Sequence, residues 1–211
     1  MLNNKFIVIE GIDGSGKTSI CHFTKTLLFK NGIFNIKSVR DPGSTPLSEK
    51  IRSLIKHSMS NEHIFKETEL LLIYAARVQL MKSIVQPELK KGNWIISDRY
   101  MLSSLAYQGG GRKINTKKIL LLQSMFLKNF SPNITFYLDV NPEIGLKRTM
   151  QRQQLDRIEK NTLQFFTQVR KTYLDVINND PKIIKINSNY NLNIVKKNFE
   201  LQFLSWLKTN I

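Results

Sequence analysis

The chain is poor in cysteine and in long apolar runs. It has one cysteine, Cys21, among 211 residues, so no disulfide can form within the chain. A lone cysteine is typical of proteins from a reducing compartment. No apolar run approaches the ~18 residues that a membrane-spanning helix needs, and the first residues, MLNNK, lack the pattern of a signal peptide. We therefore expect a soluble cytoplasmic protein that does not act at a membrane.

Negative charge is also scarce. The 16 acidic residues are outnumbered by 32 lysines and arginines, which gives a net charge of +16. An excess of this kind is typical of nucleic-acid-binding proteins. The lysines are dispersed through every segment, however, and a general enrichment in Lys, Asn and Ile explains the charge as well as a nucleic acid does. We therefore expect no nucleic-acid partner.

Residues that usually form zinc sites or hydrolase triads are not arranged for either purpose. The three histidines, His22, His57 and His63, lie apart from one another, and no metal-ligand spacing of cysteines or carboxylates surrounds them. The G-x-S-x-G motif of serine hydrolases is absent too. We interpret the histidines as structural or surface residues.

Strand and helix patterns alternate along the chain. Short apolar runs predict five strands: Phe6–Glu10, Ile36–Arg40, Trp94–Asp98, Ile134–Asp139 and Ile183–Asn187. Helical patterns occupy 18–30, 47–57, 66–91, 116–129, 142–148, 162–178 and 191–208. This alternation predicts an α/β fold, with a five-stranded parallel sheet and helices on both faces. No repeat or linker divides the chain, so we expect one domain over residues 1–211.

A glycine-rich loop follows the first strand directly. The segment GIDGSGKT fits G-x-x-x-x-G-K-[ST] and consists of Gly11, Ile12, Asp13, Gly14, Ser15, Gly16, Lys17 and Thr18. In such a P-loop the backbone N–H groups and the following helix N-terminus hold phosphates. Lys17 would reach the β- and γ-phosphates, and the Thr18 hydroxyl would bind Mg²⁺. The segment predicts a nucleoside-triphosphate site of the P-loop NTPase type.

Charged residues at the end of the third strand suit the same site. Because ligands of open α/β sheets bind beyond the carboxyl ends of the strands, Asp98 would support Mg²⁺ and Arg99 would neutralise phosphate oxygens. The alternative is a structural Asp–Arg pair. A carboxylate inside the P-loop, Asp13, suggests a hydrogen bond to a hydroxyl of a second substrate, or to Mg²⁺ through water.

Two further sets of arginines are candidates. Arg77 lies in an apolar helical pattern, where a charge must be paired or hydrogen-bonded; it either forms an internal ion pair or donates to a bound base. Arg152 and Arg157 lie in the polar segment MQRQQLDRIE. That segment is either a solvated helix end or a mobile lid, at about 149–160, that closes over the triphosphate.

Taken together, these segments resemble the thymidylate kinase family, the dTMP kinases of the P-loop nucleotide kinase group. The resemblance extends over about residues 5–175. DRYxxSSLAYQG and LDRIE carry it more specifically than the P-loop does, and the lid arginines resemble the bacterial type. It runs through FIVIEGIDGSGKT, RDPGSTPLSEKIRSL, IYAARVQL, SDRYMLSSLAYQGGGR, FYLDVNPEIGLKR and LDRIE.

The resemblance implies transfer of a phosphoryl group from Mg²⁺-bound ATP to dTMP, in a homodimer. It implies that Asp13 meets the deoxyribose 3′-hydroxyl and that Arg40 and Arg99 bind the dTMP phosphate. Arg77 and Gln108 would read the thymine.

Further roles follow from the same resemblance. Tyr107 would exclude a ribose 2′-hydroxyl, and Asp98 would support Mg²⁺. Arg152 and Arg157 would close with the lid and act with Lys17 in catalysis.

The chain departs from the family pattern in two places. Asp41 and Ser44 replace a glutamate and a glycine in the usual Glu-Pro-Gly-Gly, and Ser44 lacks the backbone freedom of glycine. Ile73 stands where relatives have a phenylalanine that stacks on the thymine. Because aromatic stacking is worth roughly 1–3 kcal/mol per base, we expect weaker dTMP binding than in a relative with phenylalanine.

Other functions remain open at this stage. The nearest alternative is a kinase for another deoxynucleotide or deoxynucleoside. A second is a basic P-loop ATPase that binds nucleic acid, although the dispersed lysines do not favour it. A GTPase would need an N-K-x-D motif after a late strand, and none occurs there.

Overall fold

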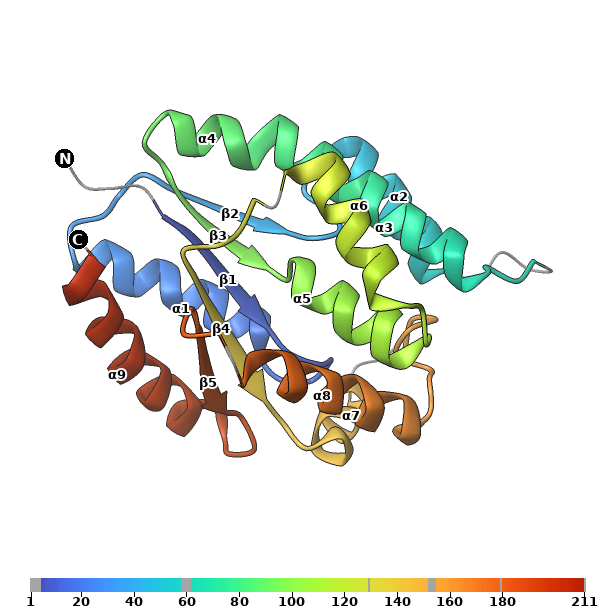
Figure 1. The fold of residues 1–211 in the computed structure, drawn as a ribbon. Helices are drawn as coiled ribbons and strands as arrows, with labels where there is room; N and C mark the ends of the chain where they lie inside the picture. Colours follow the sequence, from blue (N-terminus) through green and yellow to red (C-terminus); the bar gives the residue numbers. More distant parts are fainter. Residues whose placement is uncertain (1–4, 58–61, 129, 152–154, 179, 211) are drawn as a thin grey trace.

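A five-stranded parallel sheet forms the centre of the molecule. The computed structural model describes residues 5–57, 62–128, 130–151, 155–178 and 180–210. The strands lie in the order β2-β3-β1-β4-β5, and every neighbouring pair is parallel (Figure 1). They are β1 (Phe6–Glu10), β2 (Ile36–Arg40), β3 (Trp94–Asp98), β4 (Ile134–Asp139) and β5 (Ile183–Asn187). The predicted fold class and all five predicted strands are confirmed.

Helices connect successive strands. They are α1 (Lys17–Lys30), α2 (Pro46–Lys56), α3 (Lys66–Leu80), α4 (Gln86–Lys90), α5 (Met101–Ser104), α6 (Thr116–Leu127), α7 (Pro142–Met150), α8 (Leu163–Ile177) and α9 (Leu192–Asn210). Two π-helical segments, η1 (Met81–Val85) and η2 (Leu105–Gly111), continue α3 and α5. The predicted helix over 66–91 is therefore one run with a π-helical section inside it. The helical stretch of α5 and η2 was not predicted.

Local sequence explains where several helices begin. Thr45 caps α2 by accepting a hydrogen bond from the Ser48 N–H, and a proline occupies the first turn. Asn141 caps α7 in the same way, through the Glu143 N–H, and again a proline follows. A side-chain oxygen at this position satisfies an N–H that the helix itself leaves unpaired.

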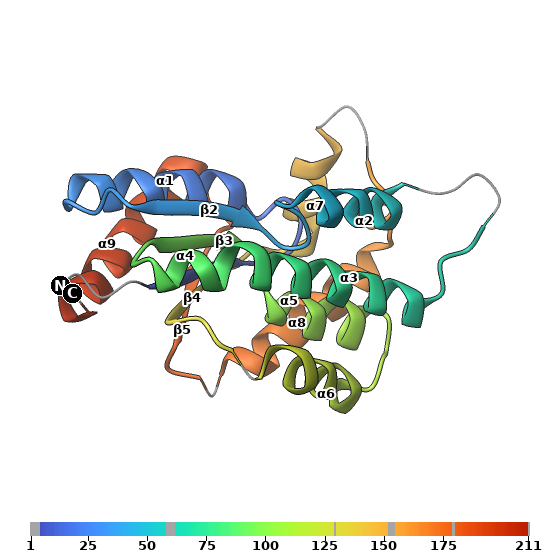
Figure 2. The ribbon, with the colours of Figure 1, turned by 90° about the horizontal axis from the view of Figure 1, so that it is seen from above.

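The sheet is buried on both faces. In Figures 1 and 2, α1 and α9 cover one face, and the run from α3 to α6, together with α8, lies over the other. Alternate residues of β1 accordingly enter different core clusters: Ile7 and Ile9 pack with α1 and α9, whereas Phe6 and Val8 pack with η1. This two-sided burial is why the central strands β1, β3 and β4 are mostly apolar, whereas the edge strand β2 (IKSVR) is largely exposed. None of the helices in the described ranges has both the length and the apolar character to cross a membrane.

An aromatic cluster joins α9 to the sheet. Phe136 of β4 is fully buried, and its ring centroid lies 4.8 Å from that of Phe199 and 5.9 Å from that of Phe203. We predict that Phe136→Ala lowers the free energy of unfolding by about 3–5 kcal/mol, because the cavity it leaves lies under α9. Urea unfolding followed by circular dichroism measures this.

Phe34, which is 66% exposed, provides a matched control. Phe34→Ala should change the free energy of unfolding by no more than about 0.5 kcal/mol. A loss as small as this for Phe136→Ala would contradict the central position assigned to that ring.

Candidate active site

The strand register brings polar side chains to one edge of the sheet. Ile9 of β1 is in register with Asp98 of β3, and Asp98 is in register with Arg40 of β2. These three strands therefore terminate side by side at one edge of the sheet. The P-loop begins at this edge, where ligands of open α/β sheets bind.

Glycine is required at particular points of the P-loop. Gly14 has φ 76° and Gly16, which precedes α1, has φ 91°. A Cβ at Gly14 would lie 2.1 Å from the carbonyl oxygen of Gly145 on α7, so only glycine fits there. Lys17 is the first residue of α1, and its Nζ donates to the Ile12 carbonyl at 2.9 Å. The loop is thus curled with its lysine directed back across it.

The loop between β5 and α9 supports the P-loop from outside. Ser188 Oγ donates to the Ser15 carbonyl at 2.6 Å. Arg148 of α7 donates to the carbonyls of Ser188 at 2.8 Å and Tyr190 at 2.7 Å, and lies 3.4 Å from the Gly14 carbonyl. These contacts fix the loop before any ligand binds.

Polar residues around the P-loop line a cavity that we name the P-loop cavity. It is lined by Asp13, Gly14, Gly16, Lys17, Thr18, Ser19, Arg40, Arg52, Lys56, Asp98, Arg99 and Glu159. Within the described ranges, no three His, Cys, Asp or Glu side chains gather into a metal-binding group. Thr18 Oγ1 lies 3.1 Å from Asp98 Oδ2, and this pair of oxygen donors suits Mg²⁺, which takes one or two protein oxygens and keeps several waters. The predicted metal residues therefore fit the ion.

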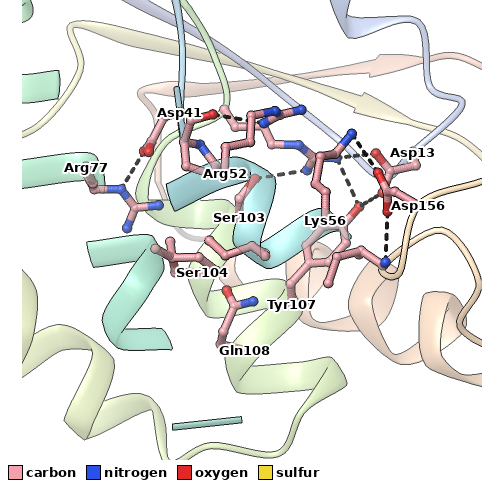
Figure 3. A pocket seen from close by; sticks show the side chains of 15 residues that line it. Asp13, Asp41, Arg52, Lys56, Arg77, Ser103, Ser104, Tyr107, Gln108 and Asp156 are labelled. Atoms are coloured by element: carbon pink, nitrogen blue, oxygen red, sulfur yellow. Dashed lines mark hydrogen bonds and ion pairs between the residues drawn. The ribbon is translucent and has the colours of Figure 1, made fainter. Parts of the chain in front are cut away.

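A second cavity, which we name the inner cavity, shares lining residues with the first. Figure 3 shows Arg77 and Asp41 towards one end, Asp13, Lys56 and Asp156 towards the other, and Gln108 below them. Four residues line both cavities: Asp13, Arg52, Lys56 and Arg99. The inner cavity is also lined by Asp41, Pro42, Ile55, Ile73, Arg77, Ser103, Ser104, Tyr107, Gln108, Asp156 and Ile158.

Arg99 lies where the two cavities meet. Its Nη2 donates to Asp13 Oδ1 at 2.7 Å and to the Tyr107 hydroxyl at 3.1 Å, and Tyr107 in turn donates to Asp13 Oδ2 at 2.8 Å. Burial would raise the pKa of Asp13, but Arg99, Lys17 and the Tyr107 hydroxyl together hold that pKa well below its usual value. Asp13 is therefore ionised, and positive and negative groups alternate between the cavities.

A buried carboxylate, Glu10, holds Arg99 through Ser103. Ser103 Oγ donates to Glu10 Oε2 at 2.6 Å and accepts from Arg99 Nη1 at 3.1 Å. Glu10 also accepts from the Tyr100 N–H at 2.8 Å and the Tyr173 hydroxyl at 2.8 Å. Burial raises the pKa of Glu10, and Arg99 opposes this. Both carboxylate oxygens of Glu10 accept hydrogen bonds from the protein, so Glu10 anchors the site. It lines neither of the two cavities.

Arg77 forms the internal ion pair that was one interpretation of its sequence position. Its Nε is paired with Asp41 Oδ2, and its Nη2 donates to the Tyr100 carbonyl at 3.1 Å. Burial would lower the pKa of Arg77, but Asp41 outweighs it and raises that pKa. The internal ion pair is therefore present, yet Nη1 has no partner among the described residues and Arg77 lines the inner cavity. A donor remains for a ligand.

Two other predicted residues, Arg40 and Arg157, are already paired with carboxylates of the protein. Arg40 lines the P-loop cavity and pairs with Glu49 at 3.0 Å. Arg157 of the predicted lid pairs with Glu69 of α3 and donates to the Ile55 carbonyl at 2.8 Å, so it lies away from the P-loop. Arg152 lies outside the described residues.

Ser44 has a backbone conformation that is typical of glycine. Its φ is 69°, in the left-handed region, which L-residues other than glycine rarely adopt. Its hydroxyl accepts from the Arg40 N–H at 2.7 Å, and its own N–H donates to Glu49 Oε1 at 2.6 Å. These hydrogen bonds offset the backbone strain at this position.

Some residues of the site were not predicted. Arg52 and Lys56 lie four apart on α2, so they share one helix face, and both line the two cavities. Asp156, within the LDRIE segment, pairs with Lys56 at 2.6 Å and brings that segment onto α2. The sequence signal that could have identified Arg52 and Lys56 is the i,i+4 spacing of two basic residues after the RDPGST segment.

Comparison with known proteins agrees with this geometry. The family model described as thymidylate kinase matches residues 9–199. Among curated relatives, the thymidylate kinase of Buchnera aphidicola subsp. Baizongia pistaciae is 62% identical over 209 residues, which cover 99% of each chain. Those of Wigglesworthia glossinidia brevipalpis and Vibrio parahaemolyticus are 44% and 42% identical over at least 98% of each chain. The chain belongs to the thymidylate kinase family, as its motifs had indicated.

Proposed function

We propose that the protein transfers the terminal phosphoryl group of ATP to dTMP, forming ADP and dTDP. The observation that carries this proposal is the pair of adjoining cavities, because they share Asp13, Arg52, Lys56 and Arg99. ATP binds at the P-loop, and dTMP occupies the inner cavity with its phosphate at the shared residues. The reaction supplies a precursor for dTTP and so belongs to nucleotide biosynthesis.

The transfer is direct and in line. An oxygen of the dTMP phosphate attacks the γ-phosphorus, the bond from that phosphorus to the β–γ bridging oxygen breaks, and ADP leaves with the electron pair. The attacking oxygen is already ionised, so no strong general base is needed. The protein contributes position and positive charge: Lys17 and the P-loop N–H groups hold the triphosphate, while Arg99 lies between the two phosphates. Thr18 and Asp98 would hold Mg²⁺ here, and the ion would supply further neutralisation of the phosphate charge.

Five residues of the inner cavity have proposed roles towards the base and sugar of dTMP. Arg77 Nη1 and Gln108 read the thymine edge, and Ile73 packs against its face. Asp13 accepts from the 3′-hydroxyl, since each carboxylate oxygen can accept a further hydrogen bond. Tyr107 occupies the space that a ribose 2′-hydroxyl would need, which favours deoxynucleotides.

Arginines complete the phosphate site. Arg52 and Arg99 bind the dTMP phosphate in this proposal, with Arg40 on the side of the P-loop cavity. The segment at about 149–160 acts as a lid, and its Arg152 and Arg157 contribute to catalysis when it closes. The contacts of Asp156 and Arg157 with α2 and α3 support a lid that docks on these two helices.

We further propose that the enzyme is a cytoplasmic homodimer that packs through α3 and α6. These helices carry apolar side chains that are more than half exposed, among them Leu71, Leu121 and Met125. Apolar surface of this kind is typical of protein–protein interfaces. The single cysteine agrees with a reducing compartment.

An acceptor panel tests the proposed function. ADP release from Mg-ATP is measured with dTMP, dUMP, dCMP, dAMP, dGMP, UMP and thymidine. We expect the highest kcat/KM with dTMP and at least about a hundredfold lower value with dCMP, because a mismatched base leaves buried polar groups unpaired. Preference for thymidine would overturn the phosphate-binding roles of Arg52 and Arg99. ATP hydrolysis that depends on DNA and proceeds without a nucleotide acceptor would instead favour the nucleic-acid-binding ATPase.

The pH dependence of ATP binding tests Lys17. Burial is the main cause that lowers the pKa of Lys17, and the charge of Arg99 is the second. Asp13, Asp98 and Glu10 oppose them, and the pKa in the free protein is about 8. Below that pH Lys17 is charged and attracts phosphate. Above that pH, Lys17 must take up a proton when ATP binds. The Kd for ATP should therefore rise by up to about tenfold per pH unit. Calorimetric titrations between pH 7 and 9.5 measure this.

Lys17→Arg is the control for that measurement. A guanidinium stays charged throughout the range, so the pH dependence should disappear in this variant, whatever its affinity at pH 7. A constant wild-type Kd up to pH 9.5 would rule out a lowered pKa for Lys17.

Ile73 tests the base-binding face of the inner cavity. We predict that Ile73→Phe lowers the KM for dTMP about fivefold or more, because stacking on a base is worth roughly 1–3 kcal/mol. Ile73→Val, which keeps an aliphatic contact, should change KM little. An unchanged or raised KM in the phenylalanine variant would remove Ile73 from contact with the base.

A further inference from the structure

A buried carboxylate lies behind the inner cavity and is not a lining residue. Glu69 of α3 has a side chain that is 1% exposed. Its Oε1 accepts from Gln108 Nε2 at 2.9 Å and from Arg112 Nε at 3.3 Å, and its Oε2 is paired with Arg157. Burial would raise the pKa of Glu69, but Arg112, Gln108 and Arg157 together lower it. Glu69 is therefore ionised.

An ionised carboxylate decides which end of the Gln108 amide faces it. A carboxylate only accepts hydrogen bonds, whereas a glutamine amide has a donating NH₂ and an accepting oxygen. With Glu69 charged, Gln108 must direct Nε2 towards it. The amide oxygen, Oε1, accepts no hydrogen bond from the described residues, and Gln108 lines the inner cavity. The cavity is thus left with an acceptor at this position.

Arg77 supplies the complementary group. Its Nη1 donates to no described residue, and a guanidinium has no acceptor. Arg77 and Gln108 both line the inner cavity (Figure 3), as do Ser104 and Asp41, whose Oγ and Oδ1 also lack a partner among the described residues. Arg77 thus offers a donor and Gln108 an acceptor. Thymine offers an acceptor at O4 and a donor at N3–H, which match this pair. Cytosine offers a donor at N4 and an acceptor at N3, so both positions are mismatched.

We propose that Glu69 is the positioning residue that sets the base preference of the site, by fixing the orientation of the Gln108 amide. This rests on the proposed function, since it takes the inner cavity as the nucleotide acceptor site. Glu69 does not touch the base. It acts through Gln108, and Arg112 and Arg157 keep its carboxylate charged and in place.

The same carboxylate connects base reading to the lid. Arg157 belongs to the LDRIE segment and reaches Glu69 Oε2, while Gln108 of η2 reaches Oε1. When the segment docks as in this structure, the guanidinium of Arg157 holds the carboxylate whose other oxygen orients Gln108. Lid docking and base selection therefore depend on one side chain.

Glu69→Gln tests the proposal because a neutral amide can donate or accept, which frees Gln108 to turn over. The kcat/KM values for dTMP, dUMP and dCMP are measured for wild type and variant. We expect the dTMP-to-dCMP ratio to fall about tenfold or more, since one buried polar mismatch has an effect of that order. The dTMP-to-dUMP ratio should stay constant, because uracil has the same N3–H and O4 groups. A merely structural loss would reduce all three values alike and leave both ratios unchanged.

Two further variants keep the test decisive. Glu67→Gln on the same helix is the matched control, because Glu67 is 62% exposed and should leave both ratios unchanged. Gln108→Leu removes the side chain through which Glu69 acts. In that background Glu69→Gln should produce no further fall in the dTMP-to-dCMP ratio. A full additional fall there would overturn the proposal, as would an unchanged ratio in the single Glu69 variant.

Failure of the proposed function gives a different result. If the wild-type protein does not phosphorylate dTMP at all, the acceptor assignment of the inner cavity is wrong. If the wild type prefers dTMP to dCMP but Glu69→Gln keeps that preference, only the role of Glu69 is wrong.

Discussion

The position of the Arg99 guanidinium depends on Glu10, a carboxylate that lines neither cavity. Glu10 ends β1 and fixes Ser103, which in turn accepts a hydrogen bond from Arg99. Arg99 also has φ 75°, a strained conformation for an arginine that persists only where the surroundings determine it. Because β1, β3 and α5 all meet at this network, the sheet register and the charge between the two cavities are fixed together.

Charge at the meeting point of the cavities is arranged in alternation. Asp13 separates Arg99 from Lys17, so the basic groups do not simply repel one another in the free protein. Arg52 and Lys56 approach from α2 on the opposite side, and Lys56 is already paired with Asp156. A site that brings two phosphate groups together needs this density of positive charge, and the interspersed carboxylates keep it compatible with folding.

The fold was more predictable than the site, for physical reasons. The central strands β1, β3 and β4 are buried along nearly their whole length, so their apolar runs mark their bounds directly. The stretch of α5 and η2 was not recognised because it ends in Gly109, Gly110 and Gly111, which usually signal a turn. Residues next to a motif, such as those of the P-loop, could be found from spacing alone. Arg52 and Glu69 could not, because their contacts join segments far apart in sequence.

The close approach of α7 to the P-loop has a consequence for how the enzyme can diversify. Gly14 and Gly145 touch through backbone atoms, and Arg148 ties the same loop to the β5–α9 connection. The backbone of the P-loop therefore tolerates little variation. The inner cavity is lined largely by side chains on α2, α3, α5 and η2, so under the proposed function substrate preference can change there while the P-loop stays intact.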